Sequence, residues 1–143
     1  MALTLPNKAP NIYTSTKQLI AGSDFNNLSA QLNSLATGLT AGAGGTQAKA
    51  LQLGAATNIV STVTTAADSV ALPKGIPGLD VTIQNAGGGN SMQVFISPQA
   101  PSGKINNVDG VATGVAQAAS LTTAVIYVCI NVDSTGVETW ISK

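Results

Sequence analysis

The feature that most constrains the fold of this chain is a series of short apolar runs from residue 46 to the C-terminus, each ended by Gly, Asn, Asp or Pro. Short runs with turn residues between them at fairly regular spacing are typical of the strands of a β-sandwich or barrel. The sequence therefore predicts an all-β domain over residues 46–143. Its expected strands are residues 48–53, 58–63, 69–72, 80–85, 91–97, 104–108, 115–119, 124–131 and 137–142.

The patterns within two of these runs indicate which side chains face the core. Leu79, Val81 and Ile83 alternate with polar residues, as in a strand with one solvated face. Residues 91–97 alternate in a similar way. The glycine-rich residues 86–90 between these two strands predict a hairpin, because its turn requires positive φ angles.

The last two expected strands carry the cysteine and the tryptophan of the chain. Residues 124–130 are apolar at successive positions, which predicts a central strand buried on both faces. Cys129 lies in this run and is expected to be a buried, unreactive thiol. Trp140 is either a core residue or an edge contact, and its size favours the core.

The first 45 residues differ from this β zone. Residues 1–22 are expected to be an extended arm, because Pro6 and Pro10 disfavour helix and central strand. Residues 23–45 are expected to be an amphipathic helix, ending near residue 39, and a glycine-rich linker. The apolar side chains of this helix recur at spacings of three and four and form a narrow seam: Phe25, Leu28, Leu32, Leu35 and Leu39. The seam packs either on the chain's own β domain or on another protein or copy, since the linker permits both.

Side chains that carry chemistry are scarce in this sequence. The 143 residues include no histidine, no arginine, one cysteine, six lysines and six acidic residues. Proton transfer, covalent catalysis and zinc binding depend on these residue types. The acidic residues are expected in structural positions: Asp24 at a helix start, Asp109 and Asp133 in turns, Asp80 and Glu138 on solvated strand faces. We therefore expect no enzyme activity, no metal site and no cofactor.

The low charge of the chain bears on its partners. Charged residues make up 8% of the sequence, against an ordinary value of about 25%, and the net charge is zero. There is no basic surface to attract nucleic acid or an anionic membrane, and no apolar run reaches the ~18–20 residues that span a bilayer. Weak electrostatic self-repulsion favours association with other copies.

About the last 90 residues resemble structural proteins of tailed phages and prophages. The shared motifs are Leu72-Pro73, Pro77-Gly78, a strand ending in Asn85-Ala86-Gly87, the run Gln93-Val94-Phe95, the turn Ile105-Asn106-Asn107, and the closing Cys129 and Trp140. Such proteins are similar to the capsid decoration, or cement, proteins that sit on the outside of a phage shell. Relatives often have glycine in place of Asn107, and residues 97–103 form a longer insert here.

Together, the residues and this resemblance lead to one set of expectations. The fold is mainly β: a jelly-roll-like β-sandwich preceded by an extended N-terminal arm and one short helix. The resemblance implies a virion protein, made in the bacterial host cytoplasm, that binds the capsid exterior and stabilises the lattice of the major capsid protein. We also expect the protein to form a homodimer or a homotrimer. The expected contact residues are Leu3, Leu5, Ile12 and Tyr13 in the arm and Phe25, Leu28, Leu32 and Leu35 in the helix. The alternative is a head-fibre, tail-fibre or receptor-binding module that contacts a host-surface carbohydrate.

Overall fold

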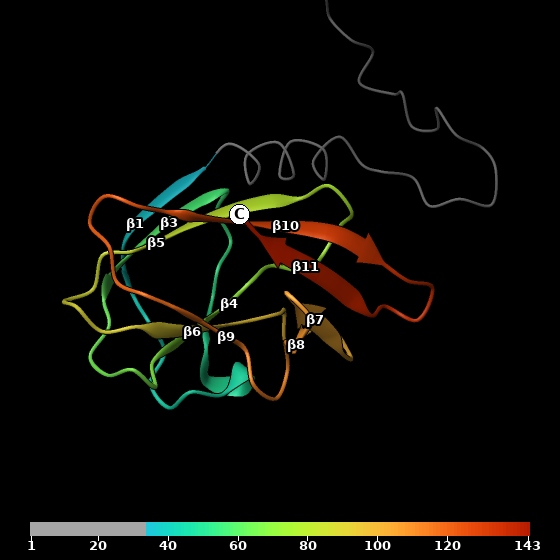
Figure 1. The fold of residues 1–143 in the computed structure, drawn as a ribbon, viewed down its shortest axis with the longest axis horizontal. Helices are drawn as coiled ribbons and strands as arrows, with labels where there is room; N and C mark the ends of the chain where they lie inside the picture. Colours follow the sequence, from blue (N-terminus) through green and yellow to red (C-terminus); the bar gives the residue numbers. More distant parts are fainter. Residues whose placement is uncertain (1–33) are drawn as a thin grey trace, which may run out of the picture.

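The computed structural model describes residues 34–143, which form two β-sheets that enclose one core (Figure 1). The larger sheet has seven strands in the order β1-β3-β5-β10-β11-β7-β8, and the smaller has four in the order β2-β4-β6-β9. The mainly β, sandwich-like fold that the sequence predicted is confirmed. The strands are β1 (Leu35–Thr40), β2 (Leu51–Gln52), β3 (Thr57–Thr62), β4 (Ser69–Ala71), β5 (Asp80–Asn85), β6 (Met92–Phe95), β7 (Gly103–Ile105), β8 (Val108–Asp109), β9 (Val115–Gln117), β10 (Val125–Val132) and β11 (Glu138–Ser142).

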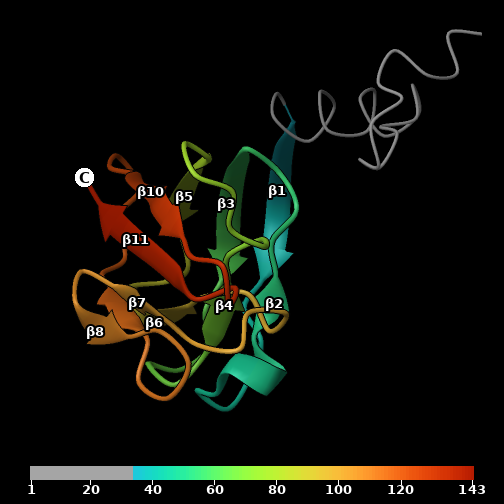
Figure 2. The same ribbon diagram turned by 90° about the vertical axis from the view of Figure 1, so that its right-hand side faces the viewer.

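The first six strands alternate between the two sheets, as Figures 1 and 2 show. Each time the chain comes back to a sheet, the new strand runs in the same direction as the previous strand of that sheet. Strands β1, β3 and β5 are therefore parallel neighbours, and so are β2, β4 and β6. The later strands pair mostly in the antiparallel sense: β10 with β5 and β11, and β9 with β6. A jelly roll is built from antiparallel strands. The sandwich is therefore as expected, while its strand connections are mixed.

Residues 86–90 do not form the predicted hairpin. They connect β5 in the larger sheet to β6 in the smaller one, so the two strands are not hydrogen-bonded to each other. Gly88 and Gly89 do have the positive φ angles expected, 63° and 92°. The flanking strands alternate as predicted, with Val81 and Ile83 buried on β5.

The end of the predicted helix is a strand instead. β1 pairs in parallel with β3, with Leu35 opposite Thr57 and Thr40 opposite Thr62. The spacing of Leu35 and Leu39 is typical of a helix, but it is a local preference and therefore a weak one. The hydrogen bonds that β1 forms with β3 stabilise the strand instead. Gly38 in this strand has a φ of 70°, which is incompatible with a right-handed helix. Residues 23–33 of the predicted helix, and the arm 1–22, lie outside the described residues.

The predicted linker also belongs to the β domain. Gly42 forms an isolated bridge with Ser69, whose backbone groups exchange two hydrogen bonds with it at 2.8 and 2.7 Å. A Cβ on Gly42 would overlap the carbonyl oxygen of Lys49, so the chain is tightly packed at this point. The β domain therefore includes residues 35–45, which the sequence had assigned to the helix and the linker.

The core lies between the two sheets. Its largest fully buried side chains are Trp140 on β11, Tyr127 on β10 and Phe95 on β6. Cys129 and Trp140 are both fully buried, as the sequence predicted. A single 3-10 turn, η1 (Gln47–Lys49), is the helical element of the described part, and it stands where a strand was expected to begin.

Candidate interaction surfaces

Only one of the eight predicted contact residues lies in the described part of the chain. Leu35 is the first residue of β1, the edge strand of the larger sheet, and it is 62% exposed. It is therefore available for contact, although on a strand rather than on a helix. The other seven lie outside the described residues: Leu3, Leu5, Ile12, Tyr13, Phe25, Leu28 and Leu32.

Strand β10 shows an apolar surface that the sequence analysis placed in the core. β10 is central in the larger sheet, between β5 and β11, but it is buried on only one face. Tyr127 and Cys129 point inward, whereas Ile126 and Ile130 are 38% and 51% exposed. The prediction of burial on both faces was wrong because the smaller sheet covers just one side of the larger one.

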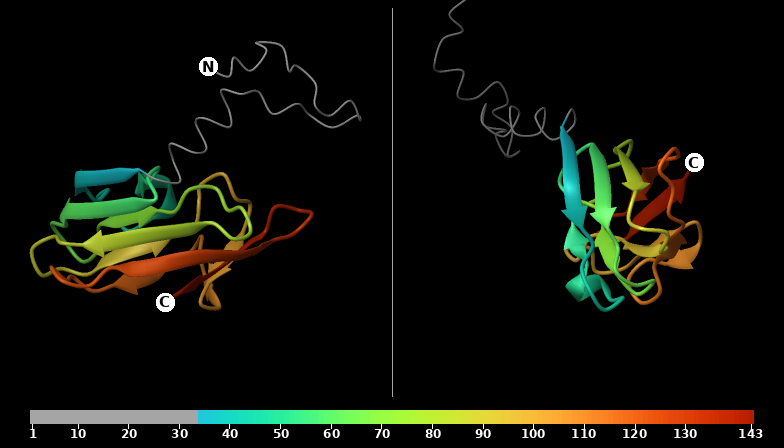
Figure 3. Two further views of the ribbon diagram at one scale, coloured as in Figure 1. Left: turned by 90° about the horizontal axis from the view of Figure 1, so that it is seen from above. Right: turned by 90° about the vertical axis from the view of Figure 1, so that its left-hand side faces the viewer.

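We call the side of the larger sheet that faces away from the smaller sheet the outer face. Figure 3 shows β1, β3, β5 and β10 side by side from above. On β1, β3, β5, β10 and β11 the single charged side chain of the outer face is Asp80. Strand pairing and burial place these apolar residues on it: Leu35, Ile59, Ile126, Val128, Ile130 and Ile141.

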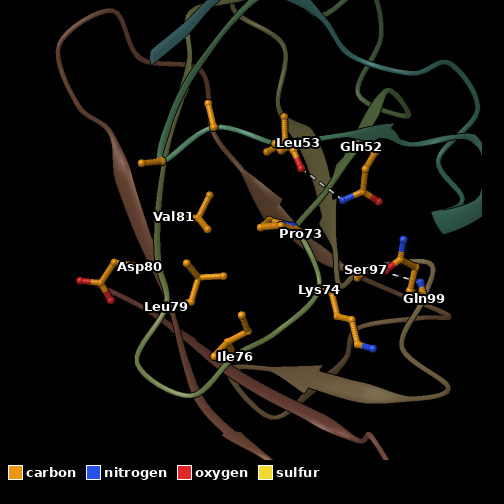
Figure 4. Close-up of a pocket in the computed structure, with 13 residues that line it drawn as sticks. Gln52, Leu53, Pro73, Lys74, Ile76, Leu79, Asp80, Val81, Ser97 and Gln99 are labelled. Atoms are coloured by element: carbon orange, nitrogen blue, oxygen red, sulfur yellow. Dashed lines mark hydrogen bonds between the residues drawn. The ribbon is translucent and has the colours of Figure 1, made fainter. Parts of the chain in front are cut away.

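A slot of about 400 Å³ opens between the loops that follow β2 and β4 (Figure 4). Its floor is apolar and includes the buried Leu53 and Val81, and the exposed Ile76 lies at its rim. Asp80 lines the same region, but its side chain points away from Val81 (Figure 4). Lys74 also lines the slot, but it lies on the opposite side from Asp80 in Figure 4, so these two ionisable side chains do not converge as catalytic groups do.

Three of the four aspartates among residues 34–143 fix turns, and the fourth, Asp80, lies on β5. The Asp133 carboxylate accepts hydrogen bonds from the Thr135 hydroxyl and from the backbone N–H groups of Thr135 and Val137. The hydroxyl bond is the main cause that lowers the pKa of Asp133. Asp109 accepts from the N–H groups of Ala112 and Val111, which lower its pKa in that order. Asp133 lies in a turn, as predicted, whereas Asp109 is the last residue of β8 and its side chain caps the turn that follows.

Asp68 caps a further turn that the sequence analysis did not identify. Its carboxylate accepts hydrogen bonds from the backbone of Thr64 and Thr65 and from the Thr65 hydroxyl. The backbone bond from Thr65 contributes most to the lowered pKa of Asp68. A carboxylate that accepts several hydrogen bonds is held in its ionised, structural state.

Glu138 corrects a prediction, since it is buried at 1% exposure instead of solvated. One carboxylate oxygen, Oε1, accepts a hydrogen bond from the Gly75 N–H at 2.7 Å, and Oε2 accepts one from the Trp140 indole N–H at 2.9 Å. A Cβ on Gly75 would lie 2.8 Å from the Glu138 Cδ atom and 3.0 Å from the Cys129 Sγ atom. Glu138 therefore joins a loop to β11 inside the core.

The buried thiol and phenol are poor candidates for chemistry. Burial, with the nearby Glu138 charge, raises the pKa of Cys129 to about 11, so the thiol stays protonated near neutral pH. Burial also raises the pKa of Tyr127 well above its usual range. The Tyr127 hydroxyl donates to Gln117 Oε1 at 3.1 Å and so connects the two sheets.

The turn aspartates predict acid sensitivity. Because their pKa values are lower in the folded than in the unfolded chain, their stabilising contribution is complete above about pH 5 and is lost as the pH falls through the folded values. We expect the urea midpoint of unfolding to fall between pH 6 and pH 2.5. Asp133→Asn keeps an acceptor oxygen without the charge, so this variant should lose less stability over that interval than the unaltered protein. Asp80→Asn is the matched control, because the Asp80 carboxylate accepts no hydrogen bond within residues 34–143. In this variant the urea midpoint should fall between pH 6 and pH 2.5 by as much as in the unaltered protein.

Among residues 34–143, no group of three Cys, Asp or Glu side chains is placed to hold a metal ion. No helix there has the length and apolar character that crossing a membrane requires.

Comparison with known proteins adds no relative. No protein-family model matches the chain, and no curated protein or solved structure matches it.

Proposed function

We propose that this protein is a non-enzymatic structural protein of a phage virion, which binds the outside of the capsid and stabilises the lattice of the major capsid protein. The observation that carries the proposal is that most acidic side chains of the described domain have structural roles. Asp68, Asp109 and Asp133 fix turns and Glu138 is buried. The two ionisable side chains that line the slot, Asp80 and Lys74, lie on opposite sides of it. What the domain offers a partner is exposed apolar surface with few charges.

Such a surface suits binding to an assembled shell. A protein that binds the assembled lattice and not the free subunits stabilises the lattice by mass action. Repetition of the contact by symmetry, through a homodimer or homotrimer, lets individually weak apolar contacts sum. The arm is the segment that would reach neighbouring subunits, through Leu3, Leu5, Ile12 and Tyr13.

The carbohydrate-binding alternative has less support. Binding pockets for small molecules are commonly lined by aromatic side chains. In the described part of the chain the aromatic residues Phe95, Tyr127 and Trp140 are all at most 2% exposed.

Capsid binding is tested with the full-length protein and with capsids of the encoding phage assembled without it. We expect the protein to sediment with these capsids and to raise the temperature at which they open. A variant with Leu3, Leu5, Ile12 and Tyr13 replaced by Ser keeps the length of the arm and should remain in the supernatant.

Each part of the proposal can fail separately in this experiment. If the unaltered protein stays in the supernatant, capsid decoration is excluded. If the serine variant sediments as fully as the unaltered protein, the arm is not the contact. The unfolding midpoint of each variant, measured without capsids, serves as the control for folding.

A further inference from the structure

The slot of Figure 4 lies where the three parallel strands of the smaller sheet end. Strands β2, β4 and β6 are parallel neighbours, so their carboxyl ends meet at one edge of that sheet. The residues that closely follow each strand line the slot: Leu53 and Gly54 after β2, Pro73 and Lys74 after β4, and Ser97 and Gln99 after β6. In α/β proteins, the carboxyl ends of parallel strands are the usual position of the ligand site.

The size and the walls of the slot favour a small molecule. Residues 53–56 lead from β2 to β3, and residues 72–79 lead from β4 to β5, so both segments cross from the smaller to the larger sheet. A hole that the chain itself bounds on two sides leaves no open course for an extended peptide. Its volume of about 400 Å³ falls within the range of small-molecule sites.

One side of the slot carries hydrogen-bond donors that have no acceptor among residues 34–143. Ser97 is 1% exposed, and its hydroxyl oxygen accepts a hydrogen bond from the Gln99 backbone N–H at 3.2 Å but donates none. The Lys74 ammonium and the Gln99 side-chain amide also make no hydrogen bond within this part of the chain. Figure 4 shows the three side chains on the same side of the slot, and the pairing of β4 with β6 brings their segments together.

The backbone at Ser97 is fixed by the rest of the domain. Gln47 Nε2 donates hydrogen bonds to the carbonyl oxygens of Ile96 and Ser97 at 3.2 and 3.0 Å. The Ala100 N–H donates to the same Ser97 oxygen at 3.0 Å. A donor that is already held in place loses less conformational freedom when a ligand binds, so the Ser97 hydroxyl is suited to recognition.

The remainder of the slot selects the other end of the ligand. The side chains of Leu53 and Val81 form an apolar floor, and burial of an apolar group on them favours binding. Asp80 lies on the side opposite Lys74 (Figure 4), and like charges repel each other. An anionic group is therefore directed toward Lys74, and the apolar part of the same molecule toward the floor.

We propose that the slot binds a small carboxylate with an aliphatic chain. The carboxylate oxygens accept hydrogen bonds from Lys74 Nζ, Ser97 Oγ and Gln99 Nε2, and the chain packs on Leu53 and Val81. The ammonium determines the charge of the ligand, and the floor determines its apolar part. This inference concerns the domain alone and holds whether or not the protein binds capsids.

Titration of the full-length, ¹⁵N-labelled protein with hexanoate tests the site, with amide chemical shifts as the readout. We expect saturable shifts centred on residues 53–56 and 72–79, with a dissociation constant of about 1 mM or lower. The matched probes are 1-hexanol, which lacks the charge, and acetate, which lacks the chain. Each should bind at least about tenfold more weakly than hexanoate, because each loses one half of the recognition.

Substitutions at the slot separate the roles of its side chains. Lys74→Gln keeps a polar side chain without the charge and should weaken hexanoate binding at least about tenfold. Ser97→Ala removes one donor and should weaken it about fivefold. Asp80→Asn removes the repulsion and should strengthen binding about twofold. The matched control is Lys104→Gln, at an exposed lysine on β7 that does not line the slot, and it should stay within about twofold of the unaltered protein.

Three outcomes would overturn the proposal. The absence of saturable shifts up to about 10 mM hexanoate would exclude the site. Equal affinities for hexanoate and 1-hexanol, or for Lys74→Gln and the unaltered protein, would show that the carboxylate is not recognised. A peptide with a free C-terminal leucine that binds at least about tenfold more tightly than hexanoate would assign the slot to a chain terminus instead. Urea midpoints of all variants show whether the domain is intact in each comparison.

Discussion

Replacing Trp140 with Ala is expected to lower the free energy of unfolding by about 3–5 kcal/mol, the usual cost of truncating a buried aromatic side chain. Trp140 is fully buried on β11, which lies between β10 and β7 in the larger sheet. Its loss would leave a cavity in the core. It would also leave Glu138 Oε2 without the indole donor that it accepts from at 2.9 Å, and a buried carboxylate oxygen without a partner is costly.

Equilibrium denaturation in urea measures this loss. Trp140→Phe keeps most of the apolar volume and removes the indole N–H, so it isolates the hydrogen bond and should cost about 1–3 kcal/mol. Leu121→Ala, at a side chain that is 79% exposed, should stay within about 0.5 kcal/mol of the unaltered protein. A loss below about 1 kcal/mol for Trp140→Ala would contradict the core that the structure describes.

The second large effect is expected at Gly42. Gly42→Ala should destabilise the protein by about 3 kcal/mol, at the upper end of the cost of overpacking. The added Cβ would overlap the Lys49 carbonyl oxygen and would lie 2.9 Å from the Leu51 backbone nitrogen. Both are backbone atoms, so the strain is relieved only by moving the loop and the bridge to Ser69 with it.

Gly54→Ala is the matched control for this substitution. A Cβ there has no neighbour within 4 Å, so the change should be neutral or slightly stabilising through the unfolded chain. The same urea titration compares the two variants. Equal stabilities would show that residues 42–45 behave as a free linker, which was the interpretation from sequence, and are not packed into the β domain.

Much of the strand pattern could be predicted from the residues themselves. The expected strand 80–85 coincides with β5, and 58–63 and 124–131 differ from β3 and β10 by one residue at each end. These segments have apolar β-branched residues between turn signals, a local property that needs no knowledge of the rest of the fold. The expected strand 104–108 is instead β7 and β8, joined by a turn at Asn106 and Asn107, whose φ angles are 51° and 67°.

Glu138 could have been placed correctly from the sequence. Residues two apart on a strand share a face, so a core position for Trp140 implies an inward Glu138. The charge of the side chain led to the opposite prediction. The signal was present in the spacing, while the partner that makes burial tolerable, the Gly75 N–H, lies 63 residues away and is visible only in the structure.

The seven contact residues predicted outside the described part stay predictions, and for Leu35 the sequence predicted exposure but not the right element. Alternation and turn residues by themselves determined that the chain forms a β-sandwich-like domain with Cys129 and Trp140 inside. Tertiary structure decided which strands share a sheet, that Leu35–Thr40 is a strand, and that no element among residues 34–143 covers the second face of β10. The physical reason is that alternation is a local property of each strand. The neighbour that completes a hydrogen-bond ladder, and the sheet that covers a face, come from distant parts of the chain.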